Sequence, residues 1–184
     1  MRRDDGVRGE PAHPVSPIRE TGTMASWSEV LAVAPELASK VQARFDAHGL
    51  GLLATLCRDG SPRISGIEPL FANGELWLGM MPSSRKAADL QRDPRFALHN
   101  ATVDKQVSEG DAKIAGRALL VEDADTFARF HQTFATETGE DLPPGPFPLF
   151  RANVHEVSFV QPAGDHLDID WWREGGEVVR VERR

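Results

Sequence analysis

Two turn dipeptides, Asp59-Gly60 and Asn73-Gly74, divide residues 51–81 into three apolar runs. Both dipeptides supply the positive φ angles of tight type I′ hairpins, so they restrict this part of the chain to consecutive antiparallel strands. We predict a three-strand meander here. The first run, Gly51 to Cys57, is apolar at nearly every position, which indicates a strand covered on both faces and favours a barrel.

Helix signals lie on both sides of these strands. Pro35 suits the first turn of a helix that ends at Gly49. A short helix is expected after Pro82. Residues 123–139 predict a third helix, with three phenylalanines and His131 on its apolar face and Gly139 as its end. We expect His131 in the core.

Further strands are expected after the short helix. They are placed at residues 95–101, 111–122, 150–161, 166–173 and 177–182. Together these elements predict a mainly β fold with flanking helices.

The domain organisation follows from the apolar content along the chain. Residues 1–23 carry charge, proline and glycine but no apolar stretch of the kind a signal peptide requires, so we expect a disordered tail there. A single domain is expected over residues 24–184, and Met24 is a second candidate start. Cys57 is the only cysteine, which fits a reducing compartment and a cytoplasmic location.

Charge and hydropathy exclude two classes of partner. The formal net charge is −7 and no basic stripe is visible, which argues against nucleic acid. No apolar run approaches the roughly 20 residues that span a bilayer, so no membrane partner is expected.

A polar cluster, Ser83-Ser84-Arg85-Lys86, stands at the beginning of the short helix. A helix N-terminus exposes N–H groups and attracts anions, to which serine hydroxyls and both cations can add. The two cations oppose the helix dipole at a cost of up to about 1 kcal/mol, which a bound anion would offset. The cluster therefore indicates a phosphate site, and a serine cap followed by two solvated cations is the alternative.

Three stretches resemble a known family: "ATLCRDGSPRISGIEPLF", "GELWLGMMPSSRKAADLQRDPRFALH" and "AKIAGRALLVED". They are similar to the pyridoxamine 5′-phosphate oxidase-like family of flavin-binding split β-barrels, over roughly residues 35–182. The most specific part is Ser84-Arg85-Lys86, followed by Leu90 and Asp93-Pro94-Arg95. The resemblance implies a six-stranded split β-barrel and a homodimer that binds FMN at the subunit interface. Some branches of the family bind a deazaflavin coenzyme or haem instead.

The resemblance also implies a set of cofactor-binding residues. They are Arg63, Ile64, Ser65, Met80, Met81, Ser84, Arg85 and Lys86. Arg85 and Lys86 match the phosphate-binding pair, and Met80-Met81 matches the strand end beside the flavin ring. The segment "PRISGIEP" alternates poorly for a core strand, as expected of a strand that faces a polar ligand. A protected edge strand is the alternative.

Two positions of the family pattern do not match clearly. Either Gln106 or Asp111 could take the place of a glutamine that contacts the flavin ring. The Trp-then-Arg pattern that recognises pyridoxamine phosphate is not reproduced around Trp171, Trp172 and Arg173, so we do not expect oxidation of that substrate. Because side chains alternate along a strand, at most one of the two tryptophans can lie in the core.

A second candidate group is "HLDID", which places His166, Asp168 and Asp170 on one face of a strand. This spacing is compatible with a metal or acid/base group. The alternative is a face in water, with Leu167 and Ile169 pointing inward.

The sequence contains no Ser-His-Asp pattern, Walker loop or dinucleotide-binding glycine motif, so the chemistry is assigned to the cofactor. We hypothesise a cytoplasmic, homodimeric FMN-dependent oxidoreductase acting on a small molecule, with no metal and no identified catalytic side chain. The alternatives are a deazaflavin-dependent reductase and a non-catalytic flavin- or haem-binding protein.

Overall fold

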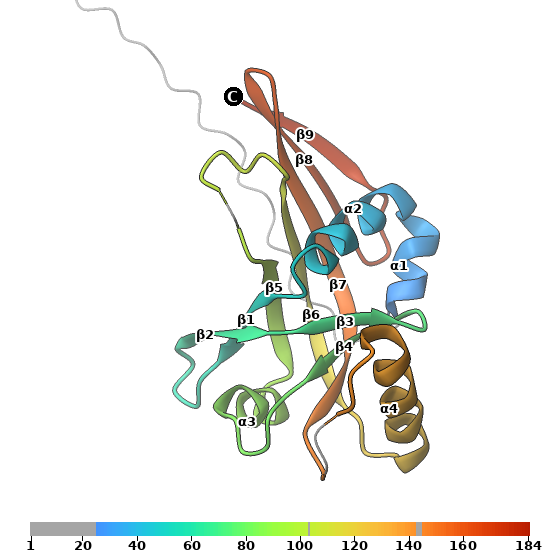
Figure 1. Ribbon diagram of the computed structural model, residues 1–184. Helices are drawn as coiled ribbons and strands as arrows, with labels where there is room; N and C mark the ends of the chain where they lie inside the picture. The colour runs from blue at the N-terminus through green and yellow to red at the C-terminus, as the bar shows by residue number, and fades with distance from the viewer. Residues whose placement is uncertain (1–24, 103, 143–144) are drawn as a thin grey trace, which may run out of the picture.

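The structure is a computed structural model that describes residues 25–102, 104–142 and 145–184. The predicted tail at residues 1–23, and Met24, lie outside the described residues. The helices are α1 (Trp27–Val33), α2 (Pro35–Asp46), α3 (Arg85–Arg92) and α4 (Ala124–Thr138) (Figure 1). The strands are β1 (Gly51–Leu56), β2 (Pro62–Ile67), β3 (Pro69–Ala72), β4 (Glu75–Gly79), β5 (Arg95–Asn100), β6 (Asp111–Leu120), β7 (Leu149–Ala163), β8 (His166–Arg173) and β9 (Val179–Arg183).

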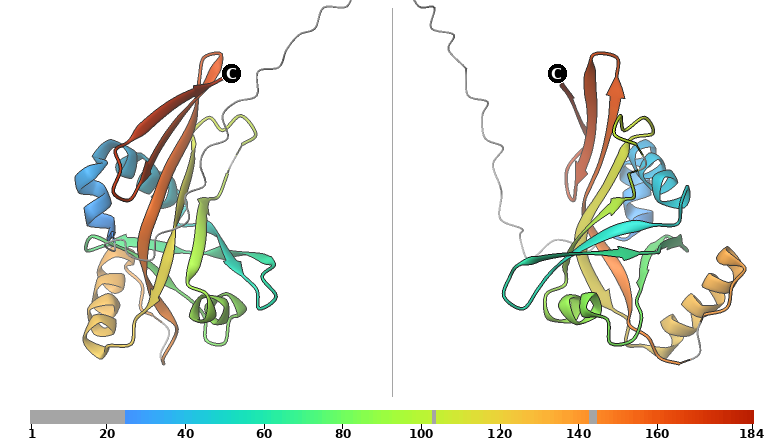
Figure 2. Two further views of the ribbon diagram at one scale, coloured as in Figure 1. Left: turned by 180° about the vertical axis from the view of Figure 1, so that it is seen from behind. Right: turned by 60° about the vertical axis from the view of Figure 1, so that its left-hand side comes forward.

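One antiparallel sheet contains all the described strands, in the order β2-β1-β5-β6-β7-β4-β3, and β8 and β9 extend it from β7. The β8–β9 hairpin and α3 lie at opposite ends of the molecule, and α3 and α4 are separate from each other in every view (Figures 1 and 2). The predicted class, mainly β with flanking helices, is confirmed. The described sheet has nine strands, whereas the resemblance implied six and the sequence pattern eight, because the predicted middle strand of the meander is divided into β2 and β3.

The predicted meander has the expected antiparallel pairing at both turns, but its middle strand is divided into β2 and β3. β2 pairs with β1, whereas β3 pairs with β4. The chain leaves β2 at Ile67, and after Glu68 it begins β3 at the other edge of the sheet. The second apolar run therefore contributes one strand to each of two hairpins, where a single strand was expected.

The two turn dipeptides also differ. Asn73 and Gly74 both have positive φ, 53° and 75°, as a type I′ turn requires. At the other turn Gly60 has positive φ but Asp59 does not, and the Cys57 N–H donates to Ser61 O across a longer loop. The type I′ prediction is confirmed at the second turn and wrong at the first.

β1 is not covered on both faces in this chain. Its residues alternate between the core and the outside, with Leu53 fully buried and Leu52 45% exposed. The apolar run Gly51 to Cys57 predicts a strand with two covered faces, but the described residues cover only one face of β1. This leaves an apolar outer face on the sheet.

The main core lies between the sheet and the first two helices. α2 contributes Leu37, Ala38, Val41 and Phe45. α1 was not predicted, although Ser26 and Glu29 form a capping box that marks its start. It buries Trp27, whose indole N–H donates to Gln42 Oε1 at 2.8 Å.

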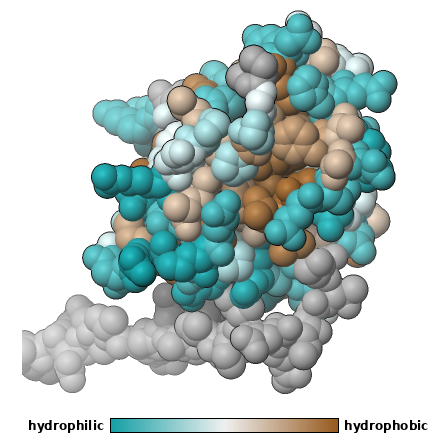
Figure 3. Space-filling model, turned by 90° about the horizontal axis from the view of Figure 1, so that it is seen from below, coloured by the Kyte–Doolittle hydropathy of each residue, from teal (hydrophilic) through white to brown (hydrophobic). Residues whose placement is uncertain are grey.

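A second apolar cluster lies under α4. Phe130 packs at 5.3 Å, centroid to centroid, from Trp77 of β4. His131 is exposed, so its predicted core position is wrong. The end of the molecule that carries α3 and α4 has apolar side chains at its surface (Figure 3), and a hollow of about 780 Å³ runs along α4 past Phe127 and His131.

A bulge interrupts the pairing of the two longest strands. The register of β6 with β7 shifts between Ala115 and Gly116. A Cβ on Gly116 would stand 1.9 Å from Asn153 O, so the close approach of these strands requires glycine. In the part of the chain that the structure describes, no helix is long and apolar enough to cross a membrane.

Candidate cofactor site

The polar cluster lies where β4 gives way to α3. Ser83 has a positive φ of 60°, which turns the chain sharply after Pro82. Ser84 is the N-cap of α3, and its Oγ accepts from the Ala87 N–H at 3.4 Å. The predicted helix start is confirmed, and no acidic residue occupies the first turn of α3.

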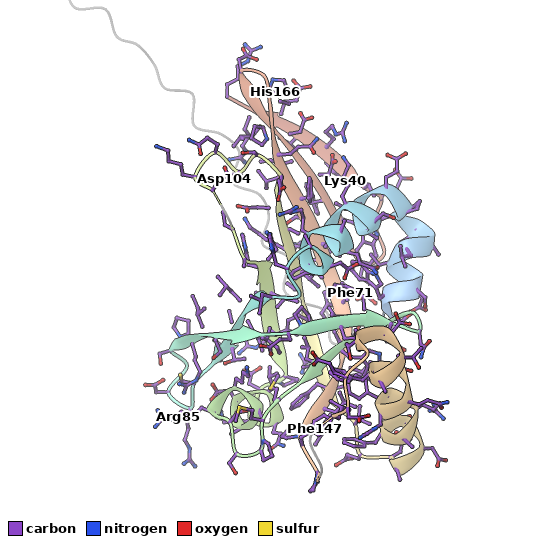
Figure 4. The ribbon with its side chains drawn as sticks, in the orientation of Figure 1. Lys40, Phe71, Arg85, Asp104, Phe147 and His166 are labelled. Atoms are coloured by element: carbon purple, nitrogen blue, oxygen red, sulfur yellow. The ribbon has the colours of Figure 1, made fainter. Side chains whose placement is uncertain are left out.

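The two cations of the first turn have different surroundings. Arg85 is exposed and extends away from the molecule (Figure 4), and no hydrogen bond or ion pair joins it to the described residues. Lys86 is half-buried, and its Nζ donates to Gly66 O of β2 at 2.5 Å. Arg85 therefore remains available for a ligand, while Lys86 also holds α3 against β2.

A buried carboxylate joins α3 to the neighbouring hairpin. Asp89 Oδ2 accepts from Arg63 Nε of β2 at 2.7 Å and from Thr55 Oγ1 of β1 at 3.0 Å. Asp89 Oδ1 accepts from Arg92 at 3.1 Å. Burial alone would raise the pKa of this carboxyl, but its hydrogen bonds to Arg63, Arg92 and Thr55 outweigh burial and hold the pKa below its usual value.

Sequence reasoning missed Asp89 and Thr55. A carboxylate in the middle of a short helix looks like a solvated residue, and nothing in the local pattern shows that Arg63 lies opposite. The resemblance implies that Arg63 binds the cofactor, but in the structure its Nε donates a hydrogen bond to Asp89. Its side chain is 27% exposed, so the outer guanidinium N–H groups retain access to a ligand.

β2 presents the predicted residues on two faces. Arg63 and Ser65 are half-buried, whereas Ile64 points the other way and is 71% exposed. β2 is at the edge of the sheet, as the alternative interpretation of "PRISGIEP" had it. The edge position and a ligand-facing role are compatible, because α3 lies beside this strand.

The two methionines at the end of β4 differ strongly in exposure. Met81 is 79% exposed, but Met80 is 4% exposed and belongs to the main core. The structure thus brings Arg63, Lys86 and the start of α3 together. The side chain of Met80 lies apart from that surface.

The outer face of the sheet next to this site is apolar. Ile64 pairs with Ala54, which pairs in turn with Ala97 of β5. Leu52 stands on the same face two residues before Ala54 and is 45% exposed. An apolar face of this kind is typical of a protein interface.

The position of the ring-contacting glutamine stays open. Gln106 is exposed in the loop before β6. Asp111, the first residue of β6, accepts from Thr102 Oγ1 at 3.0 Å and lies 3.7 Å from His99 Nε2.

Trp171, Trp172 and Arg173 at the end of β8 have different surroundings. Trp172 is 3% exposed in the main core, whereas Trp171 is half-buried, so the two point to opposite faces as predicted. Arg173 pairs with Glu156 at 2.6 Å.

The fold and its comparison with known structures define the class of protein. PhzG from Burkholderia lata 383, solved in complex with tetrahydrophenazine-1-carboxylic acid, is 16% identical with a TM-score of 0.59, over 82% of this chain and 91% of PhzG. ChuZ from Campylobacter jejuni is 14% identical with a TM-score of 0.65, over 80% of this chain and 63% of ChuZ. A heme binding protein from Mycobacterium smegmatis is 20% identical with a TM-score of 0.55, over 74% of this chain and 58% of that protein's chain. The chain is a split β-barrel protein.

The sequence itself gives the family. Residues 37–161 match the family model of pyridoxamine 5′-phosphate oxidase, and the chain belongs to this family. Among curated proteins, no sequence matches this chain significantly.

Proposed function

We propose that this protein is an FMN-dependent oxidoreductase that acts on a small molecule. The observation that carries the proposal is Arg85, an exposed cation without a partner among the described residues, in a helix turn that has no acidic residue. Family membership supports a flavin. FMN ends in a phosphate, and the beginning of α3 offers N–H groups and two cations to such a group.

Each residue of the site has a distinct role in this proposal. Arg85 would bind the phosphate, and Lys86 would add a charge from its position against β2. Arg63, whose Nε is held by Asp89, would offer its outer N–H groups to the cofactor. When bound, FMN supplies hydride and electron transfer, and the protein orients it and excludes water.

The proposal includes a homodimer. The apolar outer face with Leu52, Ala54, Ile64 and Ala97 adjoins the site, and a second copy covering it would bury these side chains and restrict water around the ring. A cytoplasmic location belongs to the same proposal, since Cys57 is the only cysteine of the sequence.

Titration of the purified protein with FMN, a deazaflavin coenzyme and haem, followed by absorption and fluorescence, tests the cofactor. We expect FMN to bind most tightly. Arg85→Ala and Lys86→Ala should each weaken FMN by at least about tenfold, since a charge-assisted hydrogen bond contributes about 1.5–3 kcal/mol. Arg129→Ala, an exposed arginine of α4, is the matched control. Unchanged FMN affinity in both site variants would contradict the proposal.

Haem binding without turnover is the second candidate, because one structural neighbour is a heme binding protein. It predicts a haem-type absorption spectrum for the titrated protein. It also predicts no reduction of bound flavin by a nicotinamide donor.

A further inference from the structure

The β8–β9 hairpin brings three potential metal ligands together. His166 and Asp168 stand two residues apart on β8, and Glu182 of β9 pairs directly with Asp168. One donor atom from each of the three side chains lies within 4.8 Å of the others. Strand pairing therefore holds an imidazole and two carboxylates on one face of the hairpin.

The spacing of these donors suits a transition metal. Zinc binds His nitrogen and carboxylate oxygen at about 2.0–2.2 Å, so two ligands at a tetrahedral centre stand about 3.4 Å apart. His166 Nε2 and Asp168 Oδ1 are 3.2 Å apart. Glu182 is exposed, and its long side chain can close the remaining distance.

A third carboxylate, Asp165, orients the imidazole. Asp165 Oδ1 lies 3.2 Å from His166 Nδ1, which leaves Nε2 as the nitrogen that faces Asp168. Metal-bound histidines usually donate their other N–H to a carboxylate in this way, which fixes the ring and its tautomer. Asp165 also lies 3.7 Å from Arg184 Nε, so its own charge is partly balanced.

Asp170, the third residue that the sequence assigned to this group, is not part of it. It is 6% exposed and accepts two hydrogen bonds from Arg180, at 2.6 and 2.7 Å. Lys40 of α2 lies 3.6 Å away. The alternative prediction, a solvent-exposed face with Leu167 and Ile169 pointing inward, is also wrong, because Asp170 is buried whereas Leu167 is 40% exposed.

The charges around the three ligands favour a cation. Arg180 is engaged by Asp170, which leaves Asp168 and Glu182 facing each other beside His166. Two carboxylates this close repel each other, and a divalent ion between them would remove the repulsion. Figure 4 shows His166 beside the turn between β7 and β8, at the opposite end of the molecule from Arg85.

We propose that His166, Asp168 and Glu182 bind a divalent transition metal of the zinc type. Asp165 orients the imidazole. Because zinc prefers four ligands and these three side chains supply one each, at least one coordination position is left to water. The site is independent of the flavin. A failure of FMN to bind would leave it untouched.

Calorimetric titration of the full chain with Zn²⁺, in a buffer that does not chelate and without an affinity tag, tests the proposal. We expect one saturable site per chain. Glu182→Gln and His166→Ala should each lower Zn²⁺ affinity by at least about tenfold, and Asp165→Asn, which removes only the orienting partner, by on the order of tenfold.

His131→Ala, at an exposed histidine of α4, should leave Zn²⁺ binding unchanged. Glu182 is exposed, so Glu182→Gln tests the ligand set even if His166→Ala disturbs the hairpin. The absence of a saturable site, or equal affinity in Glu182→Gln and the wild type, would overturn the proposal.

Discussion

Replacing Asp89 tests whether the buried carboxylate holds α3 in place. Asp89→Ala removes charge-assisted hydrogen bonds to Arg63 and Arg92 and the acceptor of Thr55. The two arginine side chains are 27% and 36% exposed, so water replaces part of what they lose. Losing each ion pair should lower the free energy of unfolding by about 1 kcal/mol. Losing the acceptor of the buried Thr55 hydroxyl should lower it by about 1 kcal/mol more. The expected loss of stability is about 3 kcal/mol.

Urea unfolding and thermal melting measure this loss. In a protein of this size, about 3 kcal/mol corresponds to a melting temperature lower by about 6–12 °C. Asp89→Asn keeps an acceptor but loses the charge, so it should cost about half as much. Asp125→Asn, at an exposed acidic residue of α4, should change stability by about 0.5 kcal/mol or less. Equal stability of Asp89→Ala and the Asp125→Asn control would refute the reasoning.

The pH dependence gives an independent check on Asp89. Its pKa is lower in the folded protein than its usual value, so the unfolded chain takes up a proton first as the pH falls. The stabilisation is complete above the unfolded pKa of about 3.9 and is lost as the pH falls through the folded pKa. The stability difference between wild type and Asp89→Asn should therefore be largest near neutral pH and shrink below about pH 4.

Two further predictions concern the sheet. Gly116→Ala should lower the free energy of unfolding, measured by thermal melting, by about 3 kcal/mol, because the added Cβ would collide with Asn153 O. The control is Gly66→Ala, whose added Cβ meets nothing within 4 Å. Similar losses for both variants would contradict the account of the bulge. Ile64→Glu should convert the proposed dimer to a monomer in analytical ultracentrifugation, because Ile64 is 71% exposed in the single chain and a charge there opposes burial against a second copy. A dimer that survives this change would exclude that face as the interface.

Local signals in the sequence were sufficient for much of the fold. Pro35 marked the first turn of α2, and the left-handed Gly139 ended α4 as expected. The start of α3 at Ser84 followed from its cap residue and the proline before it. These features depend on neighbours within one helical turn, and such interactions can be read from the sequence.

Pairing between distant segments could not be read in the same way. Nothing near Glu68 shows that β3 goes to the opposite edge of the sheet, because that choice depends on where β4 meets β7. The partners of Arg63 were hidden for the same reason, since Asp89 lies 26 residues away. Glu182 was missed because it reaches His166 only through the pairing of β8 with β9.

The single residue between β2 and β3 has a mechanical consequence. β2 and β3 are the two ends of the main strand order. Glu68 connects them covalently, so the two edge strands of the sheet are tied to each other by a single residue. Neither end can peel away without pulling on the other. A chain cut at this residue would release two unprotected strand edges at once, and we expect such a nicked protein to aggregate where the intact protein does not.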